Sequence, residues 1–304
     1  MVIRTALIGA PTSLGAFAPG QEQAPRALRE AGLHADADLG DIPLRRWAPD
    51  RTNRGAQNAA GVAAAAREVA ERVEAAFRSG HMPVVLGGDC TVGLGTLAGA
   101  QAAGERVGLV YFDMHPDLNT PETVVTGTLD WMGNAHVLGL EGAVPEVAAL
   151  TRLAPDELLL FARDPGQTKP GEQAAIEAHG VAAIDIEEVA ADPRAAAATA
   201  AARFKRYLVH FDVDVVDFVD LPLSENTGHN IGLPFDVAAA ALEVLAAGTG
   251  FAGLTVTEHN PAHGPADGSA TRTLAAALQR ALSSAASRPS GAPQSSIEEG
   301  AGMP

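Results

Sequence analysis

Acidic residues and a histidine follow directly after two apolar stretches of this sequence, Val107–Phe112 and Tyr207–Phe211. These residues are Asp113, His115 and Asp117 after the first stretch and Asp212 and Asp214 after the second. Side chains at positions i and i+2 of an extended segment point to the same side, so each group can converge on one point. Crowded carboxylates repel one another unless a cation neutralises them. The pattern therefore indicates a metal site, and two divalent ions would balance the charge.

Each of these two patterns is weak when it stands alone. Asp-x-Asp after a strand is often a solvated turn or a helix cap, and one Asp-x-His-x-Asp is a weak signal by itself. Their joint occurrence, each after an apolar strand, favours ligation. Oxygen ligands with one imidazole suit Mn²⁺ and similar hard to borderline ions. We therefore expect two divalent metal ions as cofactors, with manganese as the first choice.

The only cysteine of the chain, Cys90, ends a third motif, Gly87-Gly88-Asp89-Cys90, after the apolar run Pro83–Leu86. A lone cysteine commonly packs as a small buried hydrophobe. Its place among the other candidate ligands supports a second interpretation, in which the sulfur faces a metal. Thiolate is softer than imidazole and would shift the preference from Mn²⁺ toward Zn²⁺, Fe²⁺ or Co²⁺.

The elements that must position these residues alternate along the chain. Predicted strands are the apolar runs 2–8, 83–86, 107–112, 157–161, 182–186, 207–211 and 254–257. Predicted helices are the alanine-rich stretches 24–31, 59–79, 94–102, 171–178, 194–204, 235–246 and 269–285. Continuous apolar strands are typical of a sheet covered on both faces. The sequence thus predicts an α/β fold with a doubly wound, mainly parallel sheet, helices on both faces and a ligand site beyond the carboxyl ends of the strands.

No linker interrupts this alternation, so we expect a single domain over residues 1–286. Residues 287–304 are rich in Ser, Gly, Pro and Glu and are expected to form a disordered tail. The formal net charge of -16 argues against nucleic acid or anionic lipid as a partner. No apolar run approaches the roughly 18–20 residues of a membrane span, and the first one is too short for a signal peptide. We expect a cytoplasmic protein with no membrane partner.

The sequence resembles the arginase, agmatinase and formiminoglutamase family over nearly its whole length. The shared motifs are Ile8-Gly9-Ala10-Pro11, Leu86-Gly87-Gly88-Asp89, the Asp113–Asp117 cluster, Phe211-Asp212-Val213-Asp214 and Thr257-Glu258. The resemblance implies an arginase-like fold with two metal sites. One ion would be held by Asp113, Asp117, Asp212 and Cys90, and the other by Asp113, His115, Asp212 and Asp214.

The resemblance also implies residues that bind a small guanidino compound. Glu258 matches a glutamate that faces the guanidinium group. Asn119 and Thr126 match the residues that hold the substrate α-carboxylate in arginases. Asp164 precedes Pro-Gly, as does the aspartate that contacts the substrate α-amino group. An amino acid such as arginine or N-hydroxyarginine therefore fits better than agmatine, which lacks the carboxylate.

Two positions depart most strongly from the family pattern. Cys90 stands where the family has a histidine ligand, and Asp130 stands where arginases carry a histidine that shuttles protons. Asp130 can serve as a general acid if burial raises its pKa. His136 is a second candidate for the shuttle, although a helix histidine with local partners is the simpler interpretation.

Two functions compete at this point. The first is a metal-dependent amidinohydrolase that yields urea or hydroxyurea and an amine. The second is a binding or regulatory protein that kept the fold and lost turnover. Relatives are commonly trimers or hexamers, so the resemblance also implies a homo-oligomer.

Overall fold

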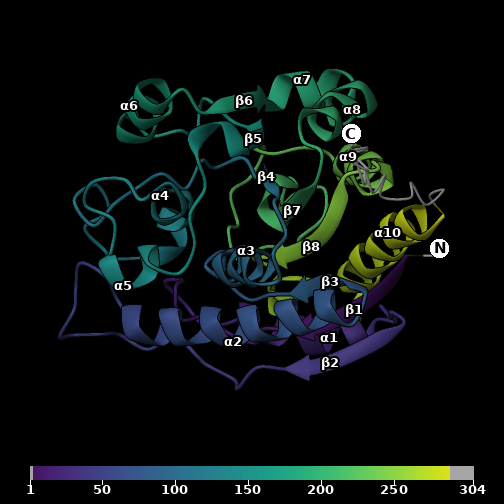
Figure 1. Ribbon diagram of the computed structural model, residues 1–304, viewed down its shortest axis with the longest axis horizontal. Coiled ribbons are helices and arrows are strands. Elements are labelled where there is room, and N and C mark those ends of the chain that lie inside the picture. Colours follow the sequence, from purple (N-terminus) through teal and green to yellow (C-terminus); the bar gives the residue numbers. More distant parts are fainter. Residues whose placement is uncertain (1–2, 288–304) are drawn as a thin grey trace, which may run out of the picture.

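The apolar runs of the sequence and one further edge strand lie side by side as one sheet of eight strands in the computed structural model, which describes residues 3–287 (Figure 1). In spatial order the strands are β2 (Ala37–Asp41), β1 (Arg4–Gly9), β3 (His81–Leu86), β8 (Phe251–Thr257), β7 (Tyr207–Asp212), β4 (Gly108–Phe112), β5 (Leu158–Arg163) and β6 (Ala182–Asp185). Every neighbouring pair in this sheet is parallel. The predicted fold class is confirmed.

Helices cover both faces of this sheet. One face carries α2 (Ala59–Arg78), α3 (Val92–Ala102), α4 (Gly133–Leu138), α5 (Pro145–Ala148) and α6 (Pro170–His179). The other face carries α1 (Ala24–Glu30), α7 (Ile186–Ala191), α8 (Pro193–Arg203), α9 (Phe235–Ala247) and α10 (Ser269–Ala286). Short 3-10 helices occupy Gln21–Gln23, Leu129–Met132, Pro155–Glu157, Val213–Val215 and Pro261–His263. Cover on both sides explains why the strands read as unbroken apolar runs.

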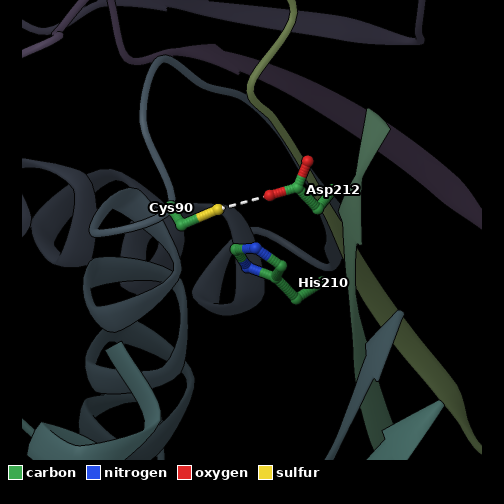
Figure 2. A group of neighbouring side chains, drawn as sticks. All are labelled: Cys90, His210 and Asp212. Atoms are coloured by element: carbon green, nitrogen blue, oxygen red, sulfur yellow. Dashed lines mark hydrogen bonds between the residues drawn. The ribbon is translucent and has the colours of Figure 1, made fainter. Parts of the chain in front are cut away.

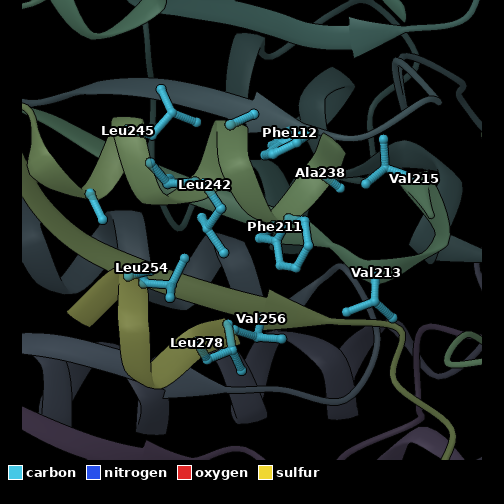
Figure 3. Close-up of a cluster of buried hydrophobic side chains, with 14 of the residues drawn as sticks. Phe112, Phe211, Val213, Val215, Ala238, Leu242, Leu245, Leu254, Val256 and Leu278 are labelled. Atoms are coloured by element: carbon cyan, nitrogen blue, oxygen red, sulfur yellow. The ribbon is translucent and has the colours of Figure 1, made fainter. Parts of the chain in front are cut away.

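Strand β7 shows how the two faces are filled. Tyr207, Val209 and Phe211 belong to the apolar cluster beneath α9 and α10, whereas Leu208 belongs to the cluster on the α2 side. Figure 3 shows the cluster around Phe211, whose ring centroid lies 5.1 Å from that of Phe112. Burial of each such large side chain stabilises the fold by about 1.5–3 kcal/mol. The strand ends are therefore anchored in the core, and this anchoring fixes the residues that follow them.

The four central strands end side by side at the carboxyl edge of the sheet. Strands β3, β8, β7 and β4 are neighbours in that order. Asp212 is the last residue of β7, Asp113 follows β4 and Glu258 follows β8, while Cys90 lies between β3 and α3. Ligands of doubly wound sheets bind at this edge. The topology alone thus gathers motifs that lie far apart in the sequence.

The sequence patterns do not predict β2, α4, α5 or α7. Strand β2 lies at the edge of the sheet and is largely exposed, so it lacks the apolar run that marks a buried strand. The three helices contain 6, 4 and 6 residues, which is too short for a helical period to stand out. Within the described residues, no helix combines the length and the apolar composition needed to span a membrane. The expected tail 287–304 lies outside the described residues except for Ser287, so its disorder stays a prediction.

Candidate metal centre

A cavity of about 730 Å³ opens at the carboxyl edge of the sheet. Six carboxylates, one thiol and one imidazole lie together in its lining. These residues, which we call the carboxylate floor, are Asp113, Asp117, Asp130, Asp212, Asp214 and Glu258 with Cys90 and His115. All of them except His115 are buried. The structure thus brings together the six predicted metal ligands and two of the three predicted catalytic residues, while their roles stay predictions.

One part of the floor is balanced in charge by the histidine. The Nδ1 atom of His115 lies 3.2 Å from Asp214 Oδ2 and 3.4 Å from Asp113 Oδ1. Burial disfavours the protonated ring, but these carboxylates hold the pKa of His115 well above its usual value. Burial also opposes ionisation of Asp214, yet the facing His115 keeps the pKa of Asp214 below its usual value. We call His115 and Asp214 the histidine half of the floor.

None of the ion pairs within residues 3–287 reaches the other part of the floor, formed by Cys90, Asp117 and Asp212, which we call the cysteine half. Cys90 Sγ lies 2.7 Å from Asp212 Oδ2 (Figure 2). Burial, reinforced by nearby carboxylates such as Asp212, raises the pKa of the Cys90 thiol well above its usual value. Burial and neighbouring acids likewise raise the pKa values of Asp117 and Asp212. The cysteine half therefore needs protons or a cation to be stable.

Asp113 lies between the two halves and serves both. Its carboxylate is grouped with His115 and Asp214 on one side and with Cys90 and Asp117 on the other. In each group the candidate ligand atoms all lie within 4.8 Å of one another. Burial, followed by repulsion from Asp214, raises the pKa of Asp113 to about 6. Such spacing is compatible with two ions that share Asp113 as a ligand.

A chain of polar contacts without a clear sequence signal lies beneath Cys90. Thr257 Oγ1 lies 3.4 Å from Cys90 Sγ and 3.0 Å from His210 Nε2. The His210 ring stacks on Tyr111, with centroids 4.4 Å apart, and burial lowers the pKa of His210 to about 3. Gly93 leaves room for this ring, because a Cβ at that position would lie 2.6 Å from His210 Nδ1. A neutral His210 thus holds Thr257, which in turn contacts the thiol.

Asp117 and Glu258 reach the floor through backbone conformations that are uncommon for residues other than glycine. Their φ angles are 50° and 63°. The hydroxyl of Tyr111 donates to Asp117 Oδ2, and Gln21 Nε2 donates to Glu258 Oε2 at 3.2 Å. Left-handed backbone of this kind persists where the surroundings hold it, often at functional sites. Tyr111 and Gln21 could not be assigned from the sequence, because one lies in an apolar strand and the other far away in the chain.

Asp130 lies between Cys90 and Glu258. Its Oδ1 atom accepts a hydrogen bond from Cys90 N at 2.6 Å. Burial and the charge of Asp89 raise the pKa of Asp130 well above its usual value. Burial and Asp130 do the same to the pKa of Glu258. A general acid at this position requires a buried carboxyl group with a raised pKa, and Asp130 has both properties.

The wall of the cavity contains two of the predicted substrate residues, Asn119 and Thr126. Asn119 Nδ2 donates to Glu172 Oε1 at 2.7 Å, and Leu118 N donates to the same atom at 3.1 Å. Glu172 is buried, and burial raises its pKa. A buried carboxylate therefore orients Asn119. The sequence carries no signal for this role, because Glu172 reads as an ordinary residue in the first turn of a helix.

Two predicted residues lie outside the lining of the cavity. The Asp164 carboxylate accepts a hydrogen bond from Gly166 N at 2.7 Å, within its own turn. His136 is buried in α4, where its Nδ1 lies 2.6 Å from Met132 O and burial lowers its pKa to about 4. Asp164 does not fit the role of binding the substrate ammonium group, because its carboxylate is hydrogen-bonded within its own loop. His136 does not fit the role of a proton shuttle, because its side chain is buried against helix α4.

The mouth of the cavity combines apolar side chains with a single strong base. Phe17, Val125 and Trp131 line it and are exposed, and the Phe17 and Trp131 rings have centroids 5.9 Å apart. Lys169 is the only lysine or arginine among the lining residues. The cavity therefore has an acidic floor and a basic residue farther out.

Comparison with known proteins gives a consistent family assignment. The model of the Arginase family matches residues 3–284. A curated arginase of Bacillus caldovelox is 29% identical over 270 residues, which cover 84% of this chain and 90% of that protein. A solved structure of arginase from the same organism has a TM-score of 0.80 at 26% identity and covers 92% of this chain and 98% of that one. Formimidoylglutamase from Bacillus subtilis has a TM-score of 0.74 at 19% identity, covering 95% and 89%, and shares the fold.

Proposed function

The chain belongs to the arginase family, a family of metal-dependent hydrolases of the ureohydrolase type, and from this premise we propose that it hydrolyses the amidino C–N bond of a guanidino carboxylate. The observation that carries the proposal is the carboxylate floor at the bottom of a cavity of about 730 Å³. An anionic floor attracts divalent cations and a guanidinium group alike. Asn119 and Thr126, in the wall of the same cavity, would bind the carboxylate at the other end of the substrate.

The donor set fits two divalent ions. Asp214 Oδ1 and Glu258 Oε1 are buried and have no hydrogen-bond partner in the part of the chain that is described, as expected of atoms that face a cation. One ion would be held by Asp113, Asp117, Asp212 and Cys90, and the other by Asp113, His115, Asp212 and Asp214. Oxygen-rich ligation makes manganese our first choice, and the sulfur also admits zinc, iron or cobalt. When bound, the ions lower the pKa of water and so supply a nucleophile at neutral pH.

Glu258 is our candidate for the residue that orients the guanidinium group. Gln21 holds its Oε2 atom, while Oε1 is left without a partner among the described residues. One oxygen therefore fixes the side chain and the other is available to a donor. Hydrogen bonds between a carboxylate and a guanidinium group are charge-assisted and directional. Glu258 can thus set the angle at which the amidino carbon faces the floor.

Asp130 is our candidate for the general acid. The reaction adds the oxygen of water to the amidino carbon and breaks the bond from that carbon to the substrate nitrogen, which leaves as an amine after gaining a proton. Asp130 is buried and grouped with Glu258, so it lies close to the nitrogen atoms that Glu258 would orient. General acids of this kind typically contribute about 10²–10⁴ in rate. The second product is urea, or hydroxyurea from an N-hydroxylated substrate.

Asn119 and Thr126 are our candidates for binding the substrate carboxylate. An asparagine amide has two N–H groups, and Glu172 uses one of those on Asn119. The other is free to donate to a ligand. Thr126 Oγ1 lies 3.0 Å from Thr128 Oγ1, so its hydroxyl is also oriented. Arginine and N-hydroxyarginine carry the required carboxylate, whereas agmatine does not.

A turnover assay tests the proposal. Protein loaded with manganese, and in parallel with zinc, iron or cobalt, is incubated with arginine, N-hydroxyarginine, agmatine and des-amino guanidino acids. Urea or hydroxyurea and the amine product are measured. We expect turnover of at least one guanidino carboxylate and little turnover of agmatine. Lack of turnover with every metal and compound would instead favour a binding or regulatory protein that kept the fold.

Matched variants sharpen this test. Glu258→Gln should lower kcat/KM by about 100-fold with the metal content unchanged, because it removes the charge that faces the guanidinium group. Asn119→Ala should mainly raise KM, by about tenfold. Asp164→Ala is the control and should leave both constants unchanged, because Asp164 lies outside the cavity lining. Full activity in Asn119→Ala would refute the assignment of Asn119 to the substrate carboxylate.

The family also suggests the setting in which the protein works. We propose a cytoplasmic homo-oligomer, a trimer or a hexamer, with no nucleic-acid or membrane partner. Size-exclusion chromatography with light scattering measures the number of subunits. A monomer at micromolar concentration would contradict this part of the proposal.

A further inference from the structure

We propose that this cavity selects guanidino carboxylates that carry no ammonium group at their carboxylate end, and that Lys169 sets this preference. The inference rests on the proposed function and narrows its substrate class. It separates two compounds that the carboxylate floor alone cannot tell apart, arginine and its des-amino counterpart. Both have the same guanidinium group, the same chain and the same carboxylate.

The loop between β5 and α6 contains two Pro-Gly pairs, and the structure shows which of them faces the cavity. The first is preceded by Asp164 and the second by Lys169. Lys169, Pro170 and Gly171 line the cavity, whereas the segment Asp164-Pro165-Gly166 does not. The resemblance to arginases assigns an aspartate before Pro-Gly to the substrate ammonium group, and in the sequence that aspartate is Asp164. At the cavity itself the residue before Pro-Gly is instead Lys169, a cation rather than an anion.

Glu172 places Lys169 next to the predicted carboxylate site. Its Oε2 atom accepts a hydrogen bond from Lys169 N at 3.0 Å, while its Oε1 atom accepts one from Asn119 Nδ2 at 2.7 Å. One buried carboxylate thus holds both segments of the wall. The backbone of Lys169 and the amide of Asn119 are fixed on either side of the same group. A carboxylate bound by Asn119 therefore lies within the field of the lysine.

The charge of Lys169 is available to a ligand. In residues 3–287 Lys169 takes part in no ion pair, and it is exposed at the cavity. Glu172 accepts a hydrogen bond from the backbone N of Lys169 and feels the charge of the lysine, but it forms no ion pair with the Lys169 ammonium group. An ammonium charge repels a second ammonium charge and attracts a carboxylate. An α-amino group beside the substrate carboxylate would cancel part of that attraction.

The test uses three compounds that differ in one group at a time. They are 5-guanidinopentanoate, arginine, which adds the α-amino group, and agmatine, which has an ammonium group and no carboxylate. For the metal-loaded wild type we expect kcat/KM to fall in that order, by about tenfold at the first step. Most of this difference should appear in KM, because Lys169 belongs to the wall of the cavity and not to the carboxylate floor.

The two lysines of the chain supply a variant and its control. Lys169→Met should raise KM for 5-guanidinopentanoate about tenfold and bring it close to KM for arginine. Lys169→Asp should reverse the order, so that arginine becomes the better substrate. Lys205→Met, at an exposed position outside the cavity lining, should change neither. Wild type that uses arginine as well as 5-guanidinopentanoate would overturn the inference, as would an unchanged KM ratio in Lys169→Met.

Calorimetric binding keeps this test separate from the test of catalysis. If none of the three compounds is hydrolysed, the proposed function fails, yet binding to the metal-loaded protein can still be measured. Tighter binding of 5-guanidinopentanoate than of arginine, lost in Lys169→Met and kept in Lys205→Met, would uphold the role of Lys169. Equal binding of the two compounds would refute it whether or not turnover is seen.

Discussion

The two halves of the carboxylate floor are built from the same kind of residue and are stabilised in opposite ways. In the histidine half, the pKa of His115 is raised and that of Asp214 is lowered, so the pair carries its own opposite charges. In the cysteine half, the pKa values of Cys90, Asp117 and Asp212 are all raised. Protein groups neutralise the first half, whereas only protons or a metal ion can neutralise the second.

This difference shows where the chain depends most on its metal. A buried carboxylate without a cationic partner is costly, and it becomes protonated before it remains buried as an anion. The histidine half can keep its geometry through an ion pair. The cysteine half keeps its geometry through a hydrogen bond, which Cys90 Sγ donates to Asp212 Oδ2 at 2.7 Å. We therefore expect the two halves to respond differently to substitution, metal and pH.

The largest effect is expected from Asp212→Ala. Asp212 contacts the thiol of one half and accepts a hydrogen bond from the backbone N of Asp214 in the other. Its removal should cost at least one metal ion per chain and lower kcat/KM by more than about 100-fold, since even indirect contacts to a ligand are worth 10–100-fold. Elemental analysis with a turnover assay measures both. If the variant retains two ions, Asp212 does not join the halves.

Cys90→Ser should affect one half alone. The substitution keeps a small polar side chain but removes the sulfur, so we expect weaker binding of the ion at the cysteine half, by about 10–100-fold, with the other ion retained. Competition with a metal chelator measures the two affinities. The comparison variant is His115→Ala, which should weaken the opposite ion. Unchanged binding of both ions in Cys90→Ser would show that the cysteine is ordinary packing, as a lone buried cysteine often is.

Cys90→His should move the pH optimum. A thiolate carries a full negative charge where an imidazole is neutral, so the wild-type ion is the weaker Lewis acid toward its water. We expect the optimum of kcat to lie about one pH unit higher in the wild type than in the variant. Parallel pH–rate profiles with the same metal measure this shift. A crystal structure adds a direct check, because ligation by sulfur requires a zinc–sulfur distance of about 2.3 Å.

The smallest effect concerns thermal stability without metal. The pKa of Asp113 is raised from 3.8 to about 6 in the folded protein, so its stabilising contribution is complete below pH 3.8 and is lost as pH rises through about 6. Metal binding replaces the proton, so the gain in Tm on adding metal should be larger at pH 7.5 than at pH 5. Each kcal/mol by which metal adds more to the free energy of unfolding at pH 7.5 should appear as a further gain of about 2–4 °C. Scanning fluorimetry at both pH values measures the gain.

Two buried histidines, His136 and His259, change stability with pH in the opposite sense to Asp113 and serve as an internal control. Burial lowers the pKa of His136 and of His259 to about 4, so their contribution to stability is present above pH 6.5 and is lost as pH falls. Neither belongs to the carboxylate floor, so their effect is the same with and without metal. Comparing the gain in Tm, rather than Tm itself, therefore isolates the floor. A gain that does not change with pH would contradict the assigned balance of charge.

Local patterns in the sequence were enough to predict the central strands of the sheet and the acidic residues that gather at their ends. Strands buried on both faces read as unbroken apolar runs, and residues at i and i+2 after such a strand share a side, so Asp113, His115 and Asp117 could be grouped without coordinates. Both signals are local, because a few neighbouring residues contain them. Edge strand β2 and helix α5 contain no such signal, so the sequence does not predict them.

The residues that come from elsewhere in the chain to surround the carboxylate floor become apparent from the folded structure. Two Pro-Gly pairs are equivalent in sequence, and the fold turns Lys169 rather than Asp164 to the cavity. It also places Glu172 behind Asn119 and encloses His136 within a helix. The path of a loop depends on hydrogen bonds between residues distant in the chain, which local periodicity does not encode. The residues of the carboxylate floor were therefore readable from the sequence, whereas the position of Lys169 at the cavity was not.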